Sequence, residues 1–224
     1  MPRYCFSQDA TGYYLKDSHS NQRPLRIDFT SPKLKRRAAQ SGKSELLLKA
    51  IGARENLRVL DCTAGLGVDA YLMAAYGCKV TLLEQSTVLG LMLQQALDRA
   101  CSDPEHDVVA ERMQLQHVNA VEYLKKYLRG IETGGTDQMP LFDVIYIDPM
   151  FPPRTKSAEV KGEMQVLQKF VGKTGNVNIL LENALATDTK RVVIKRPLRG
   201  GDIEGFTPSY QQKAKASRFD VYLR

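Results

Sequence analysis

The sequence predicts an α/β fold with a mostly parallel central sheet and helices on both faces. Two observations lead to this prediction. From residue 57 onward, short apolar runs alternate with longer segments of helical periodicity, and strands that alternate with helices pair in parallel. The first apolar run also leads directly into a Gly-rich turn that opens a helix, as in the strand–turn–helix units of such sheets.

The predicted elements follow one another in a regular order. Strands are expected at residues 57–62, 78–84, 113–119, 142–148, 190–195 and 218–223. Helices are expected at residues 44–53, 68–77, 87–100, 120–130 and 178–189. With right-handed crossovers, a sheet of this kind binds its ligands at the carboxyl ends of its strands.

Residues 1–43 depart from this pattern and are predicted to form a small N-terminal extension. The segments 4–8, 12–16 and 25–29 have the character of short strands, because Gly, Asn, Ser and Pro residues separate them. The basic stretch after them is expected to be a loop. We therefore expect a small basic extension of short strands and loop over residues 1–43, followed by an α/β domain over residues 44–224.

Length and composition fit one ordinary domain with a modest extension. The 224 residues are 43% apolar and 25% charged, which is typical of a soluble globular protein. No apolar stretch approaches the roughly 20 residues that span a bilayer, and the N-terminus lacks the apolar core of a signal peptide. We therefore expect no membrane partner. The cysteines form no CxxC pair and the histidines are scattered, so we also expect no metal site and reduced thiols in the cytoplasm.

Basic residues outnumber acidic ones and gather in two regions. The net charge is +7 and the sequence pI is about 9.2, which favours an acidic partner. Between residues 23 and 43, seven basic residues accompany a single acid, and a second basic group lies between residues 190 and 199. Clusters of this kind make nucleic acid the expected partner.

The Gly-rich turn "VLDCTAGLGVDA" indicates a cofactor that contains a nucleoside. Asp61 ends the preceding strand, and Gly65 and Gly67 allow a tight turn and a close approach of a ligand to the backbone. Glu84 ends the next strand, where a carboxylate can accept hydrogen bonds from both ribose hydroxyls. Two cofactors fit, because residues 65–70 match the dinucleotide pattern G-x-G-x-x-G/A but also suit S-adenosylmethionine.

Two acids near this turn favour S-adenosylmethionine. Asp69 begins the following helix and would face the pyrophosphate of a dinucleotide, whereas a sulfonium ligand attracts nearby carboxylates. Asp61 could hold the amino group of the methionine moiety. The dinucleotide stays open as the alternative at this point.

The fourth predicted strand ends in an acid followed by prolines, "YIDPMFPP". Asp148 and the carbonyl group of Pro149 can accept hydrogen bonds from an exocyclic amine and stabilise the positive charge that develops on its nitrogen as it attacks a methyl group. The proline stiffens the loop, and Phe151 offers a flat apolar face to a purine ring. These three residues form the candidate catalytic group. In the alternative interpretation, the prolines only end a strand and Asp148 caps the next segment.

These motifs resemble those of class I S-adenosylmethionine-dependent methyltransferases. Residues 148–151, Asp-Pro-Met-Phe, resemble the D/N-P-P-Y/F motif of enzymes that methylate exocyclic amines. The segments "TAGLGVDA", "YIDPMFP", "KSAEVKGEMQVLQKFVG" and "RVVIKRP" resemble the bacterial RsmJ family, from about residue 28 to the C-terminus. Members of that family methylate the N2 amine of one guanine in small-subunit (16S) ribosomal RNA. The resemblance implies a Rossmann-like fold, S-adenosylmethionine as cofactor, and this RNA or the small ribosomal subunit as partner.

The resemblance also carries over cofactor contacts by position. They fall on Val68, Asp69, Glu84, Gln85, Asn119, Ala120 and Asp148. Asn119 stands where many class I enzymes place an acid against the adenine amine, and an amide can still pair there. Val68 would contact the cofactor through its backbone.

The basic residues then gain a role in RNA binding. Candidate phosphate contacts are Lys35, Arg36, Arg37, Arg154, Lys156, Lys195 and Arg196. Lys195 and Arg196 end the fifth predicted strand, on the same edge of the sheet as Asp148, and phosphate contacts position a strand without reading its sequence. A guanine that is paired or stacked must leave its neighbours before its amine reaches the methyl group, so base extrusion is implied.

The sequence therefore predicts an S-adenosylmethionine-dependent methyltransferase that acts on a guanine N2 of small-subunit ribosomal RNA. An amino-methyltransferase for another RNA or for DNA adenine would use the same cofactor site. An NAD-dependent oxidoreductase would need a hydride-transfer acid or base near the fourth and fifth strands, and we find none there. A binding protein without activity would have no need of residues 148–151. The sequence sets no oligomeric state.

Overall fold

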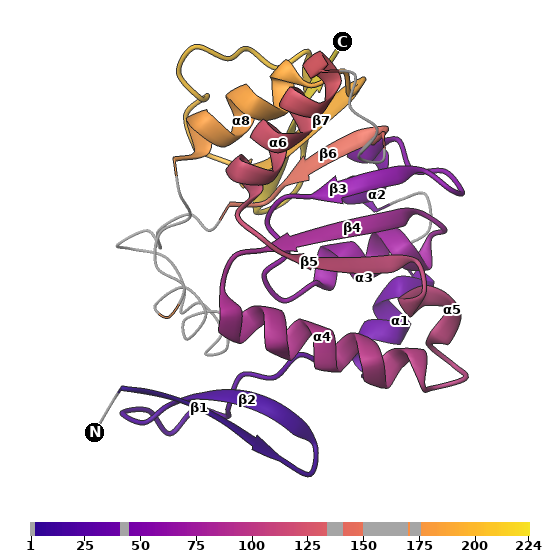
Figure 1. Cartoon of the computed structure of the whole chain (residues 1–224), viewed down its shortest axis with the longest axis vertical. Coiled ribbons are helices and arrows are strands. Elements are labelled where there is room, and N and C mark those ends of the chain that lie inside the picture. Colours follow the sequence, from indigo (N-terminus) through magenta and orange to yellow (C-terminus); the bar gives the residue numbers. More distant parts are fainter. Residues whose placement is uncertain (1–2, 41–44, 134–140, 150–169, 171–175) are drawn as a thin grey trace.

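The structure of the protein is a computed structural model, which describes residues 3–40, 45–133, 141–149, 170 and 176–224. Within these residues, the centre of the molecule is a seven-stranded sheet of order β5-β4-β3-β6-β7-β9-β8 (Figure 1). Its strands are β3 (Arg58–Asp61), β4 (Lys79–Glu84), β5 (Met113–His117), β6 (Val144–Ile147), β7 (Arg191–Pro197), β8 (Tyr210–Lys213) and β9 (Ser217–Leu223). Strands β3 to β7 pair in parallel, and β9 runs antiparallel to both β7 and β8. The predicted α/β fold with a mostly parallel sheet is confirmed.

Helices cover both faces of this sheet. They are α1 (Pro32–Gln40), α2 (Leu46–Ile51), α3 (Val68–Ala75), α4 (Thr87–Cys101), α5 (Asp107–Ala110), α6 (Ala120–Thr133) and α8 (Val177–Ala186). Helices α2, α3 and α4 contribute to the buried cluster on one face, whereas α6 and α8 contribute to the cluster on the other. Figure 1 shows α6 and α8 side by side.

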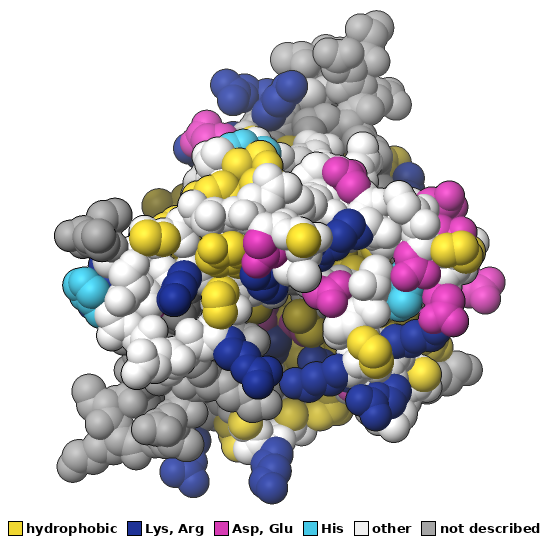
Figure 2. All heavy atoms as spheres, turned by 90° about the horizontal axis from the view of Figure 1, so that it is seen from below, with side chains coloured by type: hydrophobic (Ala, Val, Ile, Leu, Met, Phe, Trp, Pro, Cys, Tyr) yellow, Lys and Arg dark blue, Asp and Glu magenta, His cyan; other side chains and the backbone are white. Residues whose placement is uncertain are grey.

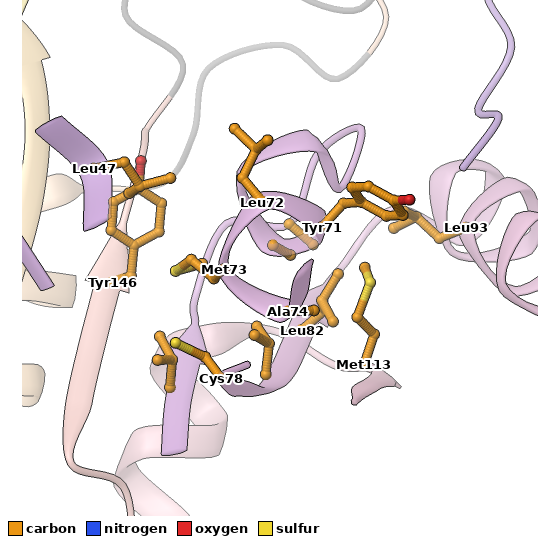
Figure 3. Close-up of a cluster of buried hydrophobic side chains, with 14 of the residues drawn as sticks. Leu47, Tyr71, Leu72, Met73, Ala74, Cys78, Leu82, Leu93, Met113 and Tyr146 are labelled. Atoms are coloured by element: carbon orange, nitrogen blue, oxygen red, sulfur yellow. The ribbon is translucent and has the colours of Figure 1, made fainter. Parts of the chain in front are cut away.

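The strands send side chains alternately into these two clusters. On β6, Val144 and Tyr146 join the cluster under α2, α3 and α4, whereas Ile145 and Ile147 join the cluster under α6 and α8. Figure 3 shows Tyr146 in the first cluster, where Leu47 and Met73 are also labelled. Because successive side chains of a strand point to opposite faces, a strand buried on both faces is apolar along most of its length. The sequence shows such strands as short continuous apolar runs.

Before the sheet, the chain forms an antiparallel hairpin that lies against α4 (Figure 1). Its strands are β1 (Tyr4–Asp9) and β2 (Gly12–Asp17). The Gln95 side chain on α4 accepts a hydrogen bond from the backbone N–H of Tyr13 at 2.5 Å. Arg99, one turn further along α4, donates to the backbone carbonyl of Thr11 at 2.6 Å. Side chains of one helix thus hold both the turn and the second strand of the hairpin.

The rest of the N-terminal segment differs from the expected strands and loop. Residues 25–29 make only a single bridge, between Leu15 and Leu25, in place of a third strand. Phe29 is buried and stacks on the ring of Tyr71 in α3, with 5.7 Å between the ring centroids. The segment 25–29 therefore packs against α3 through Phe29, and its backbone pairs with β2 only at the Leu15–Leu25 bridge.

Residues 32–40 form the helix α1 where a loop was expected. Ser31 caps this helix, since its side chain accepts a hydrogen bond from the backbone N–H of Leu34 at 3.2 Å. Pro32 occupies the first helical position, where its missing N–H is not needed. The remaining Lys, Arg, Leu, Ala and Gln residues are all good helix formers. The charge of the run suggests a loop, but its helix propensity is the stronger signal.

Two short elements were not predicted. Helix α5 has four residues, too few for a helical period to become visible in the sequence. Strand β8 has the sequence YQQK, which contains no apolar run, and it forms only because β9 offers it an antiparallel partner at the edge of the sheet. Strand β8 therefore depends on tertiary pairing, and helix α5 is too short to be recognised in the sequence.

Candidate functional site

The candidate site lies where the strand order of the sheet reverses. Strand β4 pairs with one side of β3 and β6 with the other, so the connections that follow β3 and β6 diverge. At such a switch point a crevice forms outside the carboxyl ends of the strands. Asp61 is the last residue of β3, and Asp148 directly follows β6. Two acids that are far apart in the sequence therefore meet at one edge of the sheet.

The turn between β3 and α3 depends on two glycines. Gly65 and Gly67 adopt left-handed backbone conformations, with φ values of 55° and 69°, which side-chain-bearing residues rarely adopt. At Gly67 a Cβ atom would lie 2.7 Å from the ring of Phe29, so glycine is needed for the N-terminal segment to pack there. At Gly65 a Cβ atom would meet no described atom closer than 3.7 Å. The space at Gly65 is where a ligand can approach the backbone.

Glu84, at the end of β4, is joined to this turn. Its Oε2 atom accepts a hydrogen bond from the backbone N–H of Gly65 at 3.1 Å, and its Oε1 atom accepts one from the backbone N–H of Ser86 at 2.8 Å. The carboxyl group is buried, and burial raises its pKa above the usual value. The two positions predicted to hold a nucleoside cofactor, the Gly-rich turn and Glu84, thus form one hydrogen-bonded unit.

Gln85 and Asn119 lie beside Glu84. The Asn119 side chain donates from Nδ2 to Oε1 of Gln85 at 2.6 Å, and its Oδ1 atom accepts from the backbone N–H of Val121 at 2.9 Å. Asn119 therefore supports the first turn of α6, in which Ala120 is the first residue. Since β4 and β5 are parallel neighbours, the residues that follow them reach the same edge of the sheet.

Besides Glu84, three aspartates surround the Gly-rich turn, and they are Asp61, Asp69 and Asp148. Asp61 is only 2% exposed, and its Oδ1 atom accepts a hydrogen bond from the backbone N–H of Thr63 at 3.0 Å. Burial raises the pKa of Asp61 to about 7, and the charges of Asp69 and Asp148 contribute to the rise. The hydroxyl of Thr63 accepts a hydrogen bond from the backbone N–H of Asp148 at 2.6 Å, which ties the end of β6 to the turn after β3.

Lys195 connects the other two acids. Its Nζ atom donates to Oδ2 of Asp69 at 2.8 Å and to Oδ2 of Asp148 at 2.7 Å. The hydroxyl of Tyr146, which is fully buried, donates to the same Oδ2 atom of Asp69 at 2.7 Å. The site thus contains a chain of hydrogen bonds from Tyr146 through Asp69 and Lys195 to Asp148.

Burial and this chain of hydrogen bonds together determine the pKa values of Asp148, Asp69 and Lys195. Burial raises the pKa of Asp148 to about 6, against the opposing effect of the Lys195 ammonium group. Burial alone would also raise the pKa of Asp69, but Lys195 and Tyr146 together lower it below the usual value. Burial acts to lower the pKa of Lys195, yet the two carboxylates raise it above the usual value, so the lysine stays protonated.

The remaining predicted residues fall into two groups. Lys35, Arg36 and Arg37 are exposed on α1, and Arg196 donates to the carbonyl of Gly201 at 2.6 Å. Phe151, Arg154 and Lys156 lie outside the described residues. Tyr146 and Thr63 were not predicted at all, because a tyrosine in an apolar strand and a threonine in a turn carry no distinguishing sequence signal.

The carboxylates around the turn suit a cationic ligand that carries no phosphate. The three carboxylates would repel a pyrophosphate, whereas they would attract the sulfonium and ammonium groups of S-adenosylmethionine. Glu84 would hold the ribose hydroxyls, Asp61 the amino group, and Gln85 with Asn119 the adenine. Across the described ranges, no group of three or more His, Cys, Asp or Glu residues could hold a metal ion, and no helix is long and apolar enough to cross a membrane.

Comparison with known proteins identifies the family. The model of the family described as "Putative SAM-dependent methyltransferase" matches residues 3–224. Ribosomal RNA small subunit methyltransferase J from Nitrosococcus oceani is 41% identical over 203 residues, which cover 89% of this chain and 76% of that protein. The protein of the same name from Aeromonas hydrophila is 46% identical over 191 residues, covering 84% of this chain and 73% of that protein.

The solved structures agree with the sequence comparison. The crystal structure of a SAM-dependent methyltransferase from Neisseria gonorrhoeae matches with a TM-score of 0.71 at 33% identity, covering 94% of this chain and 78% of that chain. These matches decide between the two cofactors that the Gly-rich turn left open, in favour of S-adenosylmethionine. The chain therefore belongs to the SAM-dependent methyltransferases and, within them, to the family of ribosomal RNA small subunit methyltransferase J.

Proposed function

We propose that this chain transfers a methyl group from S-adenosylmethionine to the exocyclic N2 amine of a guanine in small-subunit ribosomal RNA. The names of its relatives support the RNA substrate. The observation that carries the choice of an amine is the position of Asp148 and Pro149, at the end of β6 and beside the acid-lined turn. The resemblance of residues 148–151 to the motif of enzymes that methylate exocyclic amines also supports an amine, and the guanine N2 rests on the resemblance to the RsmJ family. A ribosomal RNA substrate would place the protein in the cytoplasm.

The proposed chemistry follows from these two residues. When bound, S-adenosylmethionine supplies an electrophilic methyl group. The Asp148 carboxylate and the Pro149 carbonyl would accept hydrogen bonds from the two N–H groups of the amine and orient its lone pair. As the nitrogen–carbon bond forms and the carbon–sulfur bond breaks, positive charge develops on the nitrogen, and the carboxylate stabilises it. The alkylated nitrogen then loses its proton to water, so no side chain need remove it before attack.

A basic surface supports RNA as the substrate. Figure 2 shows Lys and Arg side chains around a hollow on the face that carries the hairpin, with acidic side chains gathered to one side. Helix α1 packs on α3, whose first turn contains Asp69. Burial acts to raise the pKa of Asp69, Lys195 and Tyr146 lower it, and the charge of Arg37 on α1 adds a smaller lowering effect. The basic helix is therefore close enough to the site to guide RNA toward it.

The experiment that tests the function uses methyl-labelled S-adenosylmethionine. The protein is incubated with small ribosomal subunits, or with their naked RNA, from cells that lack the corresponding gene, and the labelled nucleoside is identified by mass spectrometry. We expect label in N2-methylguanosine. Label in another nucleoside, or in DNA adenine supplied as a competitor, would assign a different substrate to the same site. Binding of the cofactor without any label would contradict the proposed substrate class.

We predict that Lys35→Ala combined with Arg36→Ala weakens RNA binding without affecting cofactor binding. Two lost phosphate contacts should reduce the slope of log affinity against log salt by about 2. Titrations of labelled RNA at several salt concentrations measure this slope. The matched control replaces Lys79 and Lys190, which are exposed at the amino ends of β4 and β7, on the opposite edge of the sheet. Equal slopes for the two double variants would show that α1 contacts no phosphate.

A further inference from the structure

We propose that Lys195 is a positioning residue for methyl transfer, which holds the carboxylate of Asp148 in place and in its ionised form by bridging it to Asp69. The proposal rests on the catalytic role proposed for Asp148. It gives Lys195 a different task from the phosphate contact expected from the sequence. The geometry of the strands, the anchoring of Asp69 and the charge balance of the site each support it.

The register of the sheet places Lys195 beside Asp148. Strands β6 and β7 are parallel neighbours in which Ile147 pairs with Ile194, so the next residues of the two strands, Asp148 and Lys195, lie side by side. Strand β6 ends before Asp148, whereas Lys195 still belongs to β7. Side-chain alternation then determines the face. Ile194 points into the cluster under α6 and α8, so Lys195 points to the opposite face, toward α3. The fold itself thus directs the ammonium group into the site.

Asp69 provides a fixed anchor for that ammonium group. It lies in the first turn of α3, and its Oδ2 atom accepts hydrogen bonds from both the Tyr146 hydroxyl (2.7 Å) and Lys195 (2.8 Å). The ring of Tyr146 is immobilised by burial in the core (Figure 3). A rigid core side chain therefore orients Asp69, Asp69 orients Lys195, and Lys195 orients Asp148.

The charge balance of the site requires a cation at this position. Burial raises the pKa values of Asp61 and Asp148, and the neighbouring carboxylates raise both of them further. Lys195 acts in the opposite direction on the two acids that it contacts, Asp69 and Asp148. Without its ammonium group, the carboxyl group of Asp148 would take up a proton at higher pH, and a protonated carboxyl group stabilises a developing positive charge poorly.

The charged and titratable groups that act on Asp148 come from several elements. Lys195 of β7 lowers the pKa of Asp148 and Asp69 of α3 raises it. The charge of Asp148 in turn raises the pKa values of Asp61 of β3 and Tyr146 of β6, and Arg37 of α1 acts on Asp69. Lys195 is the cation in direct contact with Asp148 among the described residues. Its side chain is 28% exposed and makes two short ion pairs, so binding a phosphate would require both pairs to break. This arrangement favours a partner within the site over one in the RNA backbone.

Two substitutions at Lys195 test the proposal. Lys195→Met removes the charge and keeps the length of the side chain, and Lys195→Arg keeps the charge. Lys190→Met is the matched control, since Lys190 is exposed just before the same strand and at the opposite edge of the sheet. Single-turnover methyl-transfer rates are measured from pH 5 to 9 for all three variants, together with the KM and salt dependence for RNA.

The expected result is a change in the pH profile. In the unchanged protein the rate rises as Asp148 ionises, near its pKa of about 6. Lys195→Met should move this rise to higher pH by about one pH unit or more, with a rate loss of about tenfold on its acidic side. Lys195→Arg should keep the rise near its original pH. If the profile of Lys195→Met is unchanged while the salt dependence for RNA falls, Lys195 is a phosphate contact and the proposal is wrong.

A second readout does not depend on the substrate. The pKa of Asp148 is measured by carboxyl carbon NMR in the protein without RNA, with the signal assigned from Asp148→Asn. Lys195→Met should raise this pKa, and Lys195→Arg and Lys190→Met should not. An unchanged pKa in a folded Lys195→Met protein would overturn the proposal, whatever the RNA assay shows. A raised pKa with no methylated ribosomal RNA would instead place the failure in the proposed substrate.

Discussion

Asp148→Ala is expected to lower the rate of methyl transfer by about 100- to 1,000-fold, the loss typical of removing one group that stabilises charge in the transition state. The substitution removes the carboxylate that would accept a hydrogen bond from the substrate amine. Single-turnover rates with ribosomal RNA measure the effect at a saturating concentration of cofactor. Asp148 is one of the cofactor contacts that the resemblance implies, but the proposed contacts of Glu84 and Gly65 do not depend on it. Cofactor affinity measured by calorimetry should therefore stay within severalfold.

The fold should survive this substitution. The Asp148 side chain is 34% exposed, and Lys195 keeps its second carboxylate partner, Asp69. Asp188→Ala is the matched control, since Asp188 is an exposed acid (73%) whose nearest ion-pair atom lies 3.8 Å away, on Arg224. Its rate should equal that of the unchanged protein. A rate for Asp148→Ala within tenfold of that control, with an unchanged melting temperature, would contradict the proposed mechanism.

Arg218→Met is expected to reduce the free energy of unfolding by about 3–5 kcal/mol, because it would leave the buried carboxylate of Asp220 without its partner. The guanidinium of Arg218 donates to both oxygens of Asp220, at 2.8 and 3.1 Å, within β9. It also donates to Asp202 at 2.7 Å and to the carbonyl of Gly200. One side chain therefore neutralises a core acid and fastens the connection between β7 and β8. Urea unfolding followed by circular dichroism measures the loss.

Two further variants separate the buried charge from the rest of the effect. Adding Asp220→Leu to Arg218→Met removes the unpaired carboxylate and should recover most of the lost stability. Arg54→Met breaks an exposed pair, in which the charged atoms of Arg54 and Asp143 are 3.7 Å apart, and should cost less than about 1 kcal/mol. Equal losses for Arg218→Met and Arg54→Met would show that the pair in β9 does not stabilise the fold.

Much of the sheet could be predicted from the sequence, because burial on both faces makes a strand apolar along most of its length. Strands β3, β4 and β6 lie within the predicted apolar runs. Strand β8 could not be found, since its only support is its pairing with β9 at the edge of the sheet. Helix α1 was missed for a different reason. The charges of the segment point to a loop, whereas the cap residue Ser31 and the helix formers after it decide the structure.

The sequence predicted those site residues whose location follows from their position at the end of a strand. Asp61, Glu84 and Asp148 each end a strand, and parallel strands bring their carboxyl ends to one edge. The direction of a side chain within that edge needs the register between strands, which the sequence does not contain. This is why Lys195 was expected on the RNA-facing surface and is found between two acids.

The reversal of strand order also divides the site into two sets of residues, one for the cofactor and one for the substrate amine. All but one of the positions that we assign to the cofactor lie between Asp61 and Ala120, in β3, β4, β5 and the connections after them, and the exception is Asp148. Asp148 and Lys195, which we assign to the substrate amine, belong to β6 and β7 on the other side of β3. A change of methyl acceptor would therefore require substitutions around Asp148 and Lys195, whereas the residues of β3, β4 and β5 could stay the same. The ion pair between Lys195 and Asp69 links the two sets, so it would have to be kept whichever methyl acceptor is used.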